Sequence, residues 1–274
     1  MCIFEEYTPK GILSYCVHSI SYYDVVSDNE SIQRILPDGS VYLTINLEDS
    51  PLRIYEGADF GSGRTYPNFW MSGMLLKHLT IHSPKHIRAL VVKFKSIGAY
   101  PVLGIPMFEF INTVVDADVI FGNEIVSLTE DIIGTTEIMD KIHLVERWLY
   151  KRLKLEDPIS TAVVQFAIDT TLCNPDKLNM KSIANKSGFT QQHFINIFKK
   201  YVGLTPKQYE RIVRFNQILK RVNQSQTIDW SDLAFEVGYY DQSHLINDFK
   251  TFSGFSPEVY LNKAQGLEHH IPVG

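Results

Sequence analysis

An internal repeat in the C-terminal half constrains the fold of this 274-residue chain more than any other feature. Residues 182–209 align with residues 232–260 at an offset of 50, which becomes 51 after one inserted residue. Self-similarity of this extent indicates a duplicated structural unit. The identical residues are Ala184/Ala234, Gly188/Gly238, Gln191/Gln242, His193/His244, Ile195/Ile246, Asn196/Asn247, Phe198/Phe249, Lys199/Lys250, Gly203/Gly254, Pro206/Pro257 and Tyr209/Tyr260.

Each copy predicts a helix-turn-helix unit. A short helix runs into Gly188 or Gly238, and glycine suits the left-handed backbone that ends a helix. Thr190 or Asp241 then supplies a good N-cap for a second helix. The spacing of the aromatic and aliphatic residues in that second helix predicts one buried and one exposed face.

The exposed face of each second helix carries side chains suited to reading DNA bases. Amides pair bidentately with adenine, an aliphatic group contacts the thymine methyl, and lysine reaches guanine or phosphate. We therefore predict base contacts from Gln191, Gln192, Ile195, Asn196, Gln242, Ser243, Ile246 and Asn247.

One helix is expected to join the two units, 182–201 and 231–252. Residues 206–222 read as this linker, with Pro206 in the first turn, where its missing N–H costs nothing. A rigid linker would hold the two second helices at a set separation. Two helices that enter one face of B-DNA lie about 34 Å apart.

Charge is concentrated beside the first unit. Residues 177–221 carry ten lysines and arginines and one acidic residue, whereas residues 222–274 carry two against seven. Such a block is either a solvated helical face or the footprint of a polyanion. On the second interpretation we predict phosphate contacts from Lys186, Lys199, Lys200, Lys207, Arg211, Arg214 and Lys250. A duplicated scaffold that binds protein is the alternative, but it leaves the basic block unexplained.

The N-terminal half predicts strands followed by helices. Residues 14–23, 41–47, 75–81 and 87–94 mix β-branched, aromatic and aliphatic residues between turn formers. The period lengthens after Gly98, and a long amphipathic helix is predicted at 136–153 from a stripe of Ile138, Ile142, Val145, Leu149 and Leu153. The partner of this stripe lies either in the same chain or in a second subunit. The length of the stripe leads us to predict a homodimer joined through this helix.

Catalytic, metal and cofactor motifs are missing from the sequence, so we expect no enzyme, no metal and no cofactor. Cys2, Cys16 and Cys173 have no CxxC spacing and are read as reduced thiols. With no apolar run of about 20 residues and no signal peptide, we expect a cytoplasmic protein that does not enter a membrane.

Aromatic residues of the predicted strands either fill a core or line a pocket. The pocket candidates are Tyr22, Tyr42, Phe69, Trp70 and Phe94. Residues 1–157 carry 14 basic against 21 acidic residues, which disfavours an anionic ligand. We therefore expect a small, largely apolar ligand, unless the domain is filled by its own side chains.

The C-terminal half resembles the AraC family of bacterial transcription regulators over residues 158–263. The similar stretches include Ser187-Gly188-Phe189, Gly203-Leu204-Thr205-Pro206, Val237-Gly238-Tyr239, Asp241 to Leu245 and Gly254-Phe255-Ser256-Pro257. The resemblance implies an α+β chain with a small β-barrel-like N-terminal domain followed by helices, and an all-α domain with two helix-turn-helix units. It also implies double-stranded promoter DNA as partner, a homodimer, RNA polymerase as a further partner, and a small-molecule effector.

We therefore expect a sequence-specific regulator with a sensing or dimerisation domain at 1–155 and a DNA-binding domain at 158–265. Two alternatives stay open at this point. One is a DNA-binding module fused to an enzyme with Cys2 or Cys16 as nucleophile, and the other is a helical module that binds only protein.

Overall fold

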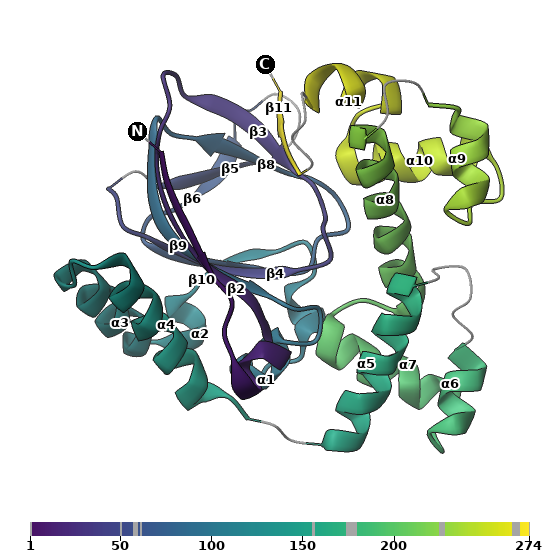
Figure 1. The fold of residues 1–274 in the computed structure, drawn as a ribbon, viewed down its shortest axis with the longest axis horizontal. Coiled ribbons are helices and arrows are strands. Elements are labelled where there is room, and N and C mark those ends of the chain that lie inside the picture. The colour runs from purple at the N-terminus through teal and green to yellow at the C-terminus, as the bar shows by residue number, and fades with distance from the viewer. Residues whose placement is uncertain are drawn as a thin grey trace.

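The computed structural model describes residues 2–49, 51–56, 60, 62–154, 157–173, 180–224, 228–264 and 269–273. Two antiparallel sheets face each other in the N-terminal domain, which comprises residues 2–154 and a strand from the C-terminal end of the chain (Figure 1). The six-stranded sheet has the order β1 (Cys2–Tyr7), β2 (Val17–Val26), β9 (His86–Phe94), β4 (Val41–Asn46), β7 (Phe69–Ser72) and β10 (Val114–Asp116). The five-stranded sheet has the order β11 (His270–Pro272), β3 (Ser31–Ile35), β8 (Leu79–Ser83), β5 (Leu52–Glu56) and β6 (Ser62–Tyr66).

The predicted strands are confirmed with two shifted starts. β2 begins at Val17 because residues Gly11–Tyr15 form a short 3-10 helix, η1. β8 begins at Leu79 because the backbone N–H of Leu76 donates to the side chain of Asn112 (2.7 Å) and not to a strand. Within the described residues each strand belongs to one sheet only, so the barrel-like domain consists of two open sheets.

Helices follow the strands, as the lengthening period predicts. The N-terminal domain ends with α1 (Ala99–Leu103), the 3-10 helix η2 (Met107–Phe110), α2 (Asp118–Phe121), α3 (Asn123–Gly134) and α4 (Ile138–Arg152). The helical domain, residues 157–264, comprises α5 (Pro158–Cys173), α6 (Met180–Lys186), α7 (Gln191–Val202), α8 (Pro206–Gln224), α9 (Trp230–Glu236), α10 (Gln242–Ser253) and α11 (Pro257–Ala264). No helix in these described ranges is long and apolar enough to cross a membrane.

The apolar stripe of α4 packs within the chain. Ile142, Val145 and Leu149 are fully buried, where α4 lies on β2 and beside α1 and α3. The expectation that this stripe joins two subunits is therefore wrong. A helix beside a sheet needs its whole apolar face for that sheet, and the sequence could not show that the sheet lay under it.

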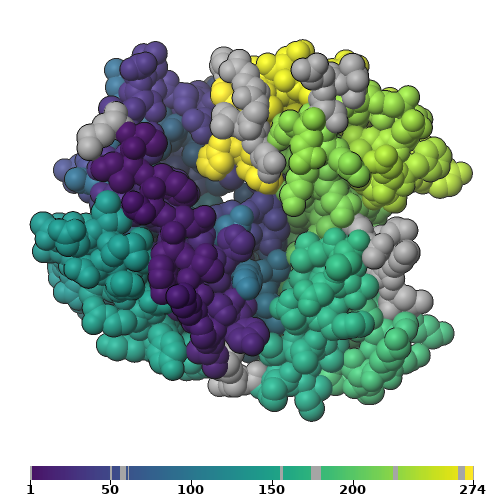
Figure 2. Space-filling view, in the orientation of Figure 1, coloured from purple at the N-terminus to yellow at the C-terminus, as the bar shows by residue number. Residues whose placement is uncertain are grey.

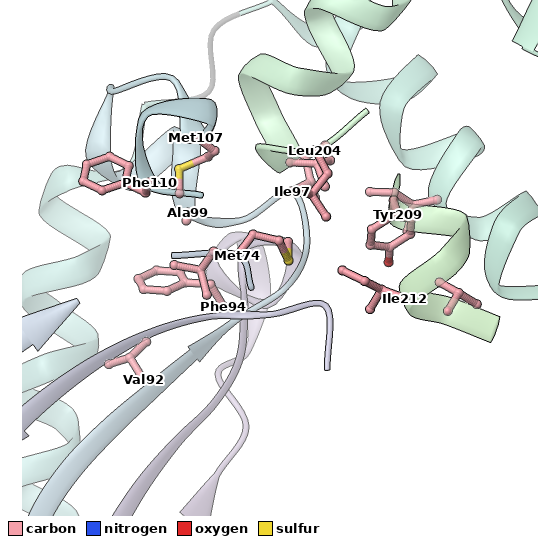
Figure 3. Close-up of a cluster of buried hydrophobic side chains, with 14 of the residues drawn as sticks. Met74, Val92, Phe94, Ile97, Ala99, Met107, Phe110, Leu204, Tyr209 and Ile212 are labelled. Atoms are coloured by element: carbon pink, nitrogen blue, oxygen red, sulfur yellow. The ribbon is translucent and has the colours of Figure 1, made fainter. Parts of the chain in front are cut away.

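One continuous core joins the two domains. Figure 3 shows Leu204, Tyr209 and Ile212 of the helical domain beside Ile97 and Met107 of the N-terminal domain. Tyr209 also bonds to Ser96 through its hydroxyl (2.9 Å), and Asn216 donates to the carbonyl of Pro37 (3.1 Å). The first half of the linker helix α8 is thus anchored to the N-terminal domain.

Candidate nucleic-acid interface and internal cavity

Both repeats fold into helix-turn-helix units with the same turn. Gly188 and Gly238 have positive φ angles of 72° and 81°, the left-handed region that favours glycine. The residue after each glycine donates its N–H to an alanine carbonyl five positions earlier (Phe189 to Ala184, 2.9 Å; Tyr239 to Ala234, 2.8 Å). The duplication read from the sequence is therefore a duplication of backbone geometry.

The predicted N-caps are confirmed in both units. The side chain of Thr190 accepts from the N–H of His193 (3.2 Å), and that of Asp241 accepts from the N–H of His244 (2.7 Å). Each cap satisfies one of the free N–H groups at the start of α7 or α10. The second helix of each unit is therefore held from its first turn, where the amide side chains lie.

The predicted base-reading side chains are mostly accessible. Six of the eight are exposed: Gln191, Gln192, Asn196, Gln242, Ser243 and Asn247. Ile195 and Ile246 are half-buried, and Ile246 packs against the main core. Figure 1 shows α8 between the two units, with α6 and α7 towards one end and α9 and α10 towards the other. At 19 residues, α8 is about 28 Å long.

Arg214 is not a phosphate ligand, which corrects the sequence prediction. Its side chain is only 5% exposed, and it pairs with the buried Glu210 one turn earlier. It also donates to the carbonyl of Gly238 (2.7 Å) and lies over the ring of Tyr239. A buried cation needs such partners, so Arg214 joins the linker helix to the turn of the second unit. The sequence did contain a sign of this pairing, because Glu210, the one acidic residue of the basic block, lies four residues before Arg214, one helical turn away.

Arg211 is also paired with a carboxylate, but its side chain is 36% exposed, so it stays a predicted phosphate contact that would share its guanidinium with Asp248. Its guanidinium makes two hydrogen bonds to the carboxylate of Asp248 (2.7 and 3.1 Å), which is buried on α10. The hydrogen bond to Asp248 raises the pKa of Arg211, so the guanidinium stays charged. Two parallel hydrogen bonds between a guanidinium and a carboxylate fix the relative position of α8 and α10.

The other five phosphate candidates remain at or near the surface. Lys186, Lys200, Lys207 and Lys250 are exposed, and Lys207 bonds to Glu210. Lys199 is half-buried and lies 5.6 Å from the centre of the Phe108 ring.

The last turn of α7 packs against the N-terminal domain. The ammonium of Lys200 lies 4.9 Å from the ring centre of Tyr100, and the rings of Tyr100 and Tyr201 are 4.7 Å apart. The phenol of Tyr100, through its hydrogen bond, raises the pKa of Lys200. Two lysines predicted to bind phosphate are thus in contact with α1 and η2, which could not be read from sequence because these segments are about 100 residues apart.

A cavity of about 460 Å³ lies between the two sheets. The six-stranded sheet contributes hydroxyl groups to its wall: Ser19, Ser21, Tyr23, Tyr42, Thr44 and Ser72. The five-stranded sheet contributes aliphatic side chains: Ile35, Leu52, Leu79 and Ile81. A volume of this size is within the range of small-molecule sites.

Two of the five predicted pocket residues, Tyr42 and Trp70, line this cavity. Tyr22, Phe69 and Phe94 do not, because they belong to the buried core on the other face of the sheet. Each of these three is one position from a lining residue, namely Tyr23, Trp70 and Lys93. Successive side chains of a strand point to opposite faces, so the prediction chose the wrong face for these three.

A polar cluster stands in the cavity wall. The carboxylate of Asp38 accepts from the Lys93 ammonium (2.7 Å) and from the Tyr42 phenol. Burial opposes ionisation of Asp38, but Lys93 and Tyr42 outweigh it, so the pKa of Asp38 is lowered. Burial and the Asp38 charge raise the pKa of Tyr42. The cluster therefore holds one ion pair and one neutral phenol at neutral pH.

Two family models match the chain. Residues 5–116 match a "domain of unknown function (DUF6597)", and residues 183–263 match a "helix-turn-helix domain". The probable transcription factor PqrA of Proteus vulgaris is 30% identical over 105 residues, which are 38% of this chain and 84% of PqrA. The chain belongs to the AraC family of transcription regulators.

Other relatives of this AraC-family protein match a smaller share of their own length. The transcriptional activator AarP of Providencia stuartii is 29% identical over 85 residues, which are 31% of this chain and 62% of AarP. The chain thus spans less than two thirds of this relative. Among solved structures, ToxT from Vibrio cholerae aligns with a TM-score of 0.44 at 11% identity, over 89% of this chain and 97% of ToxT.

Proposed function

We propose that this AraC-family protein is a sequence-specific DNA-binding transcription regulator controlled by a small molecule in its N-terminal domain. The observation that carries the proposal is the pair of helix-turn-helix units with one backbone geometry, each presenting exposed amides on its second helix. The partner is double-stranded promoter DNA, with RNA polymerase as a further partner at the promoter. Such a regulator acts in the bacterial cytoplasm, where the DNA is.

Selection of binding sites tests this proposal. The full chain is incubated with a random duplex library, and bound DNA is enriched and sequenced. We expect a two-part motif whose halves are one helical turn apart, as two helices on one face of DNA require. The double variant Gln191→Ala/Asn196→Ala should lose one half of the motif, whereas the control Lys220→Gln, exposed on α8, should keep both. Enrichment of no motif by the wild type would reject the proposal.

The effector we propose is small, uncharged and largely apolar. Support comes from the aliphatic wall of the 460 Å³ cavity and from the net acidic charge of the N-terminal half. A ligand that binds only the folded state raises the unfolding midpoint in a concentration-dependent way. In a thermal-shift screen we expect hits among neutral apolar compounds. Stabilisation by anionic metabolites alone would contradict an uncharged effector. No hit at all would favour an N-terminal domain that binds no ligand and has only a structural role.

A homodimer belongs to the same proposal, but through exposed residues and not through the buried stripe of α4. Ile133 on α3 and Tyr150 on α4, which are 64% and 62% exposed, are the residues we choose for this surface. We expect a dimer in sedimentation at micromolar concentration and a folded monomer for Ile133→Glu. A monomeric wild type would refute the dimer.

We expect no catalytic activity. Burial raises the pKa of the Cys16 thiol to about 11, although the nearby Lys95 opposes this shift. The thiolate is the reactive form, so Cys16 is a poor nucleophile at neutral pH. Alkylation kinetics check this: Cys16 should react with iodoacetamide at least tenfold more slowly than the exposed Cys2 and Cys173.

A further inference from the structure

The strand that follows the helical domain returns to the N-terminal domain and closes one side of the cavity. β11 pairs with the edge strand β3, with His270 opposite Ile35. The N–H of Leu36 donates to the carbonyl of His269, and the N–H of Val273 donates to the carbonyl of Ile32 (both 2.9 Å). His269, His270 and Ile35 all line the cavity. Figure 2 shows the yellow C-terminal segment between the strands and the green helices.

The opposite face of β11 belongs to the core shared with the helical domain. Ile271 is fully buried and joins that core, as alternation along a strand requires when His270 faces the cavity. β11 also contacts α11, and Lys263 of α11 donates to the carbonyl of Val273 (3.1 Å). α11 in turn packs on α10, the second helix of the second unit. One short strand therefore contacts both the cavity and the end of the DNA-binding domain.

The wall near β11 is polar but carries little net charge. Desolvation by the surrounding protein and the neighbouring His269 lower the pKa of His270, although its side chain keeps access to solvent, and this favours the neutral ring. Lys93 and Asp38 neutralise each other, and the Tyr42 phenol stays protonated. An anionic ligand would have to leave water without a free cation, which is costly, because Lys93 is paired with Asp38 and Glu6, the other charged side chain of the wall, is acidic. A ligand hydroxyl can instead donate to the phenol oxygen of Tyr42, whose own O–H donates to Asp38, and a ligand hydroxyl or carbonyl can accept from the imidazole N–H of His270.

We propose that β11 completes the effector site, which binds an uncharged, mainly apolar compound with one hydroxyl or carbonyl group near Tyr42 and His270. This inference rests on the effector role proposed above. Because such a ligand contacts β3, β4 and β11 at once, it stabilises the docked strand. By linkage, release of β11 lowers the affinity for the ligand by the same factor by which the ligand favours the docked strand. Occupancy of the cavity is therefore coupled to the packing of the second unit.

The test uses the full chain and the neutral, apolar fluorophore N-phenyl-1-naphthylamine as probe. Ile271→Asp places a charge where β11 meets the core and should release the strand. We expect its probe affinity to fall at least tenfold. Leu261→Asp, the same type of change on the exposed side of α11, is the matched control and should bind like the wild type. Equal affinity for wild type and Ile271→Asp would overturn the inference while the effector site stands. No binding to any variant, wild type included, would reject both.

A cross-link keeps the test decisive if Ile271→Asp does not fold. Gln33 and Pro272 are opposite each other as a non-hydrogen-bonded pair, the geometry in which side chains approach most closely. Gln33→Cys/Pro272→Cys, with Cys2 and Cys173 replaced by serine, locks β11 when oxidised. The oxidised protein should bind the probe at least as tightly as the reduced protein. Loss of binding on oxidation would show that β11 must leave for the ligand to enter and would overturn the proposal.

Discussion

The two helix-turn-helix units share one backbone but differ in what holds them. In the first unit, lysines at the end of α7 lie on Tyr100 and Phe108 of the N-terminal domain. In the second unit, the carboxylate of Asp248 on α10 accepts hydrogen bonds from Arg211 of the linker helix. At the end of α10, Arg34 of the N-terminal domain donates to the carbonyl of Ser253 (3.3 Å). Duplication thus preserved the geometry for DNA while the surrounding charges diverged. Residues 177–221 still carry ten basic residues against one acidic, whereas residues 222–274 carry two against seven, so we infer that the first unit supplies most of the electrostatic affinity and the second mainly base readout.

We expect the largest change in stability from a substitution at Arg214, which connects the linker helix to the turn of the second unit but, among the described residues, has no counterpart in the first. Arg214→Met leaves Glu210 buried without its main partner, which costs about 3 to 5 kcal/mol of unfolding free energy. Urea unfolding measures this loss. Lys220→Met, exposed on the same helix, is the control and should change stability little. A fully stable Arg214→Met whose DNA affinity has become less salt-dependent would restore the phosphate role.

Base readout by the second unit is the next effect. Asn247→Ala removes an exposed amide from α10 and should cost about 1 to 3 kcal/mol on the selected site, with little loss on random DNA. Fluorescence anisotropy on both DNAs measures the difference. Thr251→Ala, exposed one turn further along α10, controls for general damage to this helix. Equal losses on specific and random DNA would assign Asn247 to the phosphate backbone.

Mild acid should loosen the contact between the second unit and the N-terminal domain, because His78 and Arg34 lie against Gly254 at the end of α10. Burial, followed by the charges of Arg34 and Lys77, lowers the pKa of His78 from 6.5 to about 4. The folded state therefore prefers the neutral ring, so this stability is present above pH 6.5 and is lost as the pH falls towards 4. Between pH 6.5 and 5.5 the loss amounts to about 1 kcal/mol. His78→Gln should show a flatter decline than wild type in urea unfolding across this range. Parallel declines would remove His78 as the cause.

The smallest effect is expected for single lysines of the first unit. Lys186→Gln should lower the affinity for all sequences about fivefold at physiological salt and reduce the salt slope by about one. Lys220→Gln serves as control because Lys220 lies outside the predicted phosphate contacts. If Lys250→Gln on α10 changed the salt slope more than Lys186→Gln, the division of roles between the units would be reversed.

Local features of the fold were predictable from the sequence because they depend on neighbouring residues. Gly188 and Thr190 mark a helix end and a helix start through their own backbone and side-chain chemistry, and the structure confirms both. The stripe of α4 was predicted for the same reason, since a period of 3.6 identifies a buried face. What covered that face was not predictable, because β2 is more than 100 residues away.

The sequence by itself determined the family, the double helix-turn-helix unit and the amides it presents. Only the tertiary structure decided that Arg214 is buried, that Tyr22, Phe69 and Phe94 face the core, and that β11 returns to β3. Periodicity shows that a residue belongs to one face of its helix or strand, but not which face the rest of the chain will cover. Burial of a charge, access to a cavity and the pairing of an edge strand depend on contacts between distant segments, and these exist only once the domains have packed together.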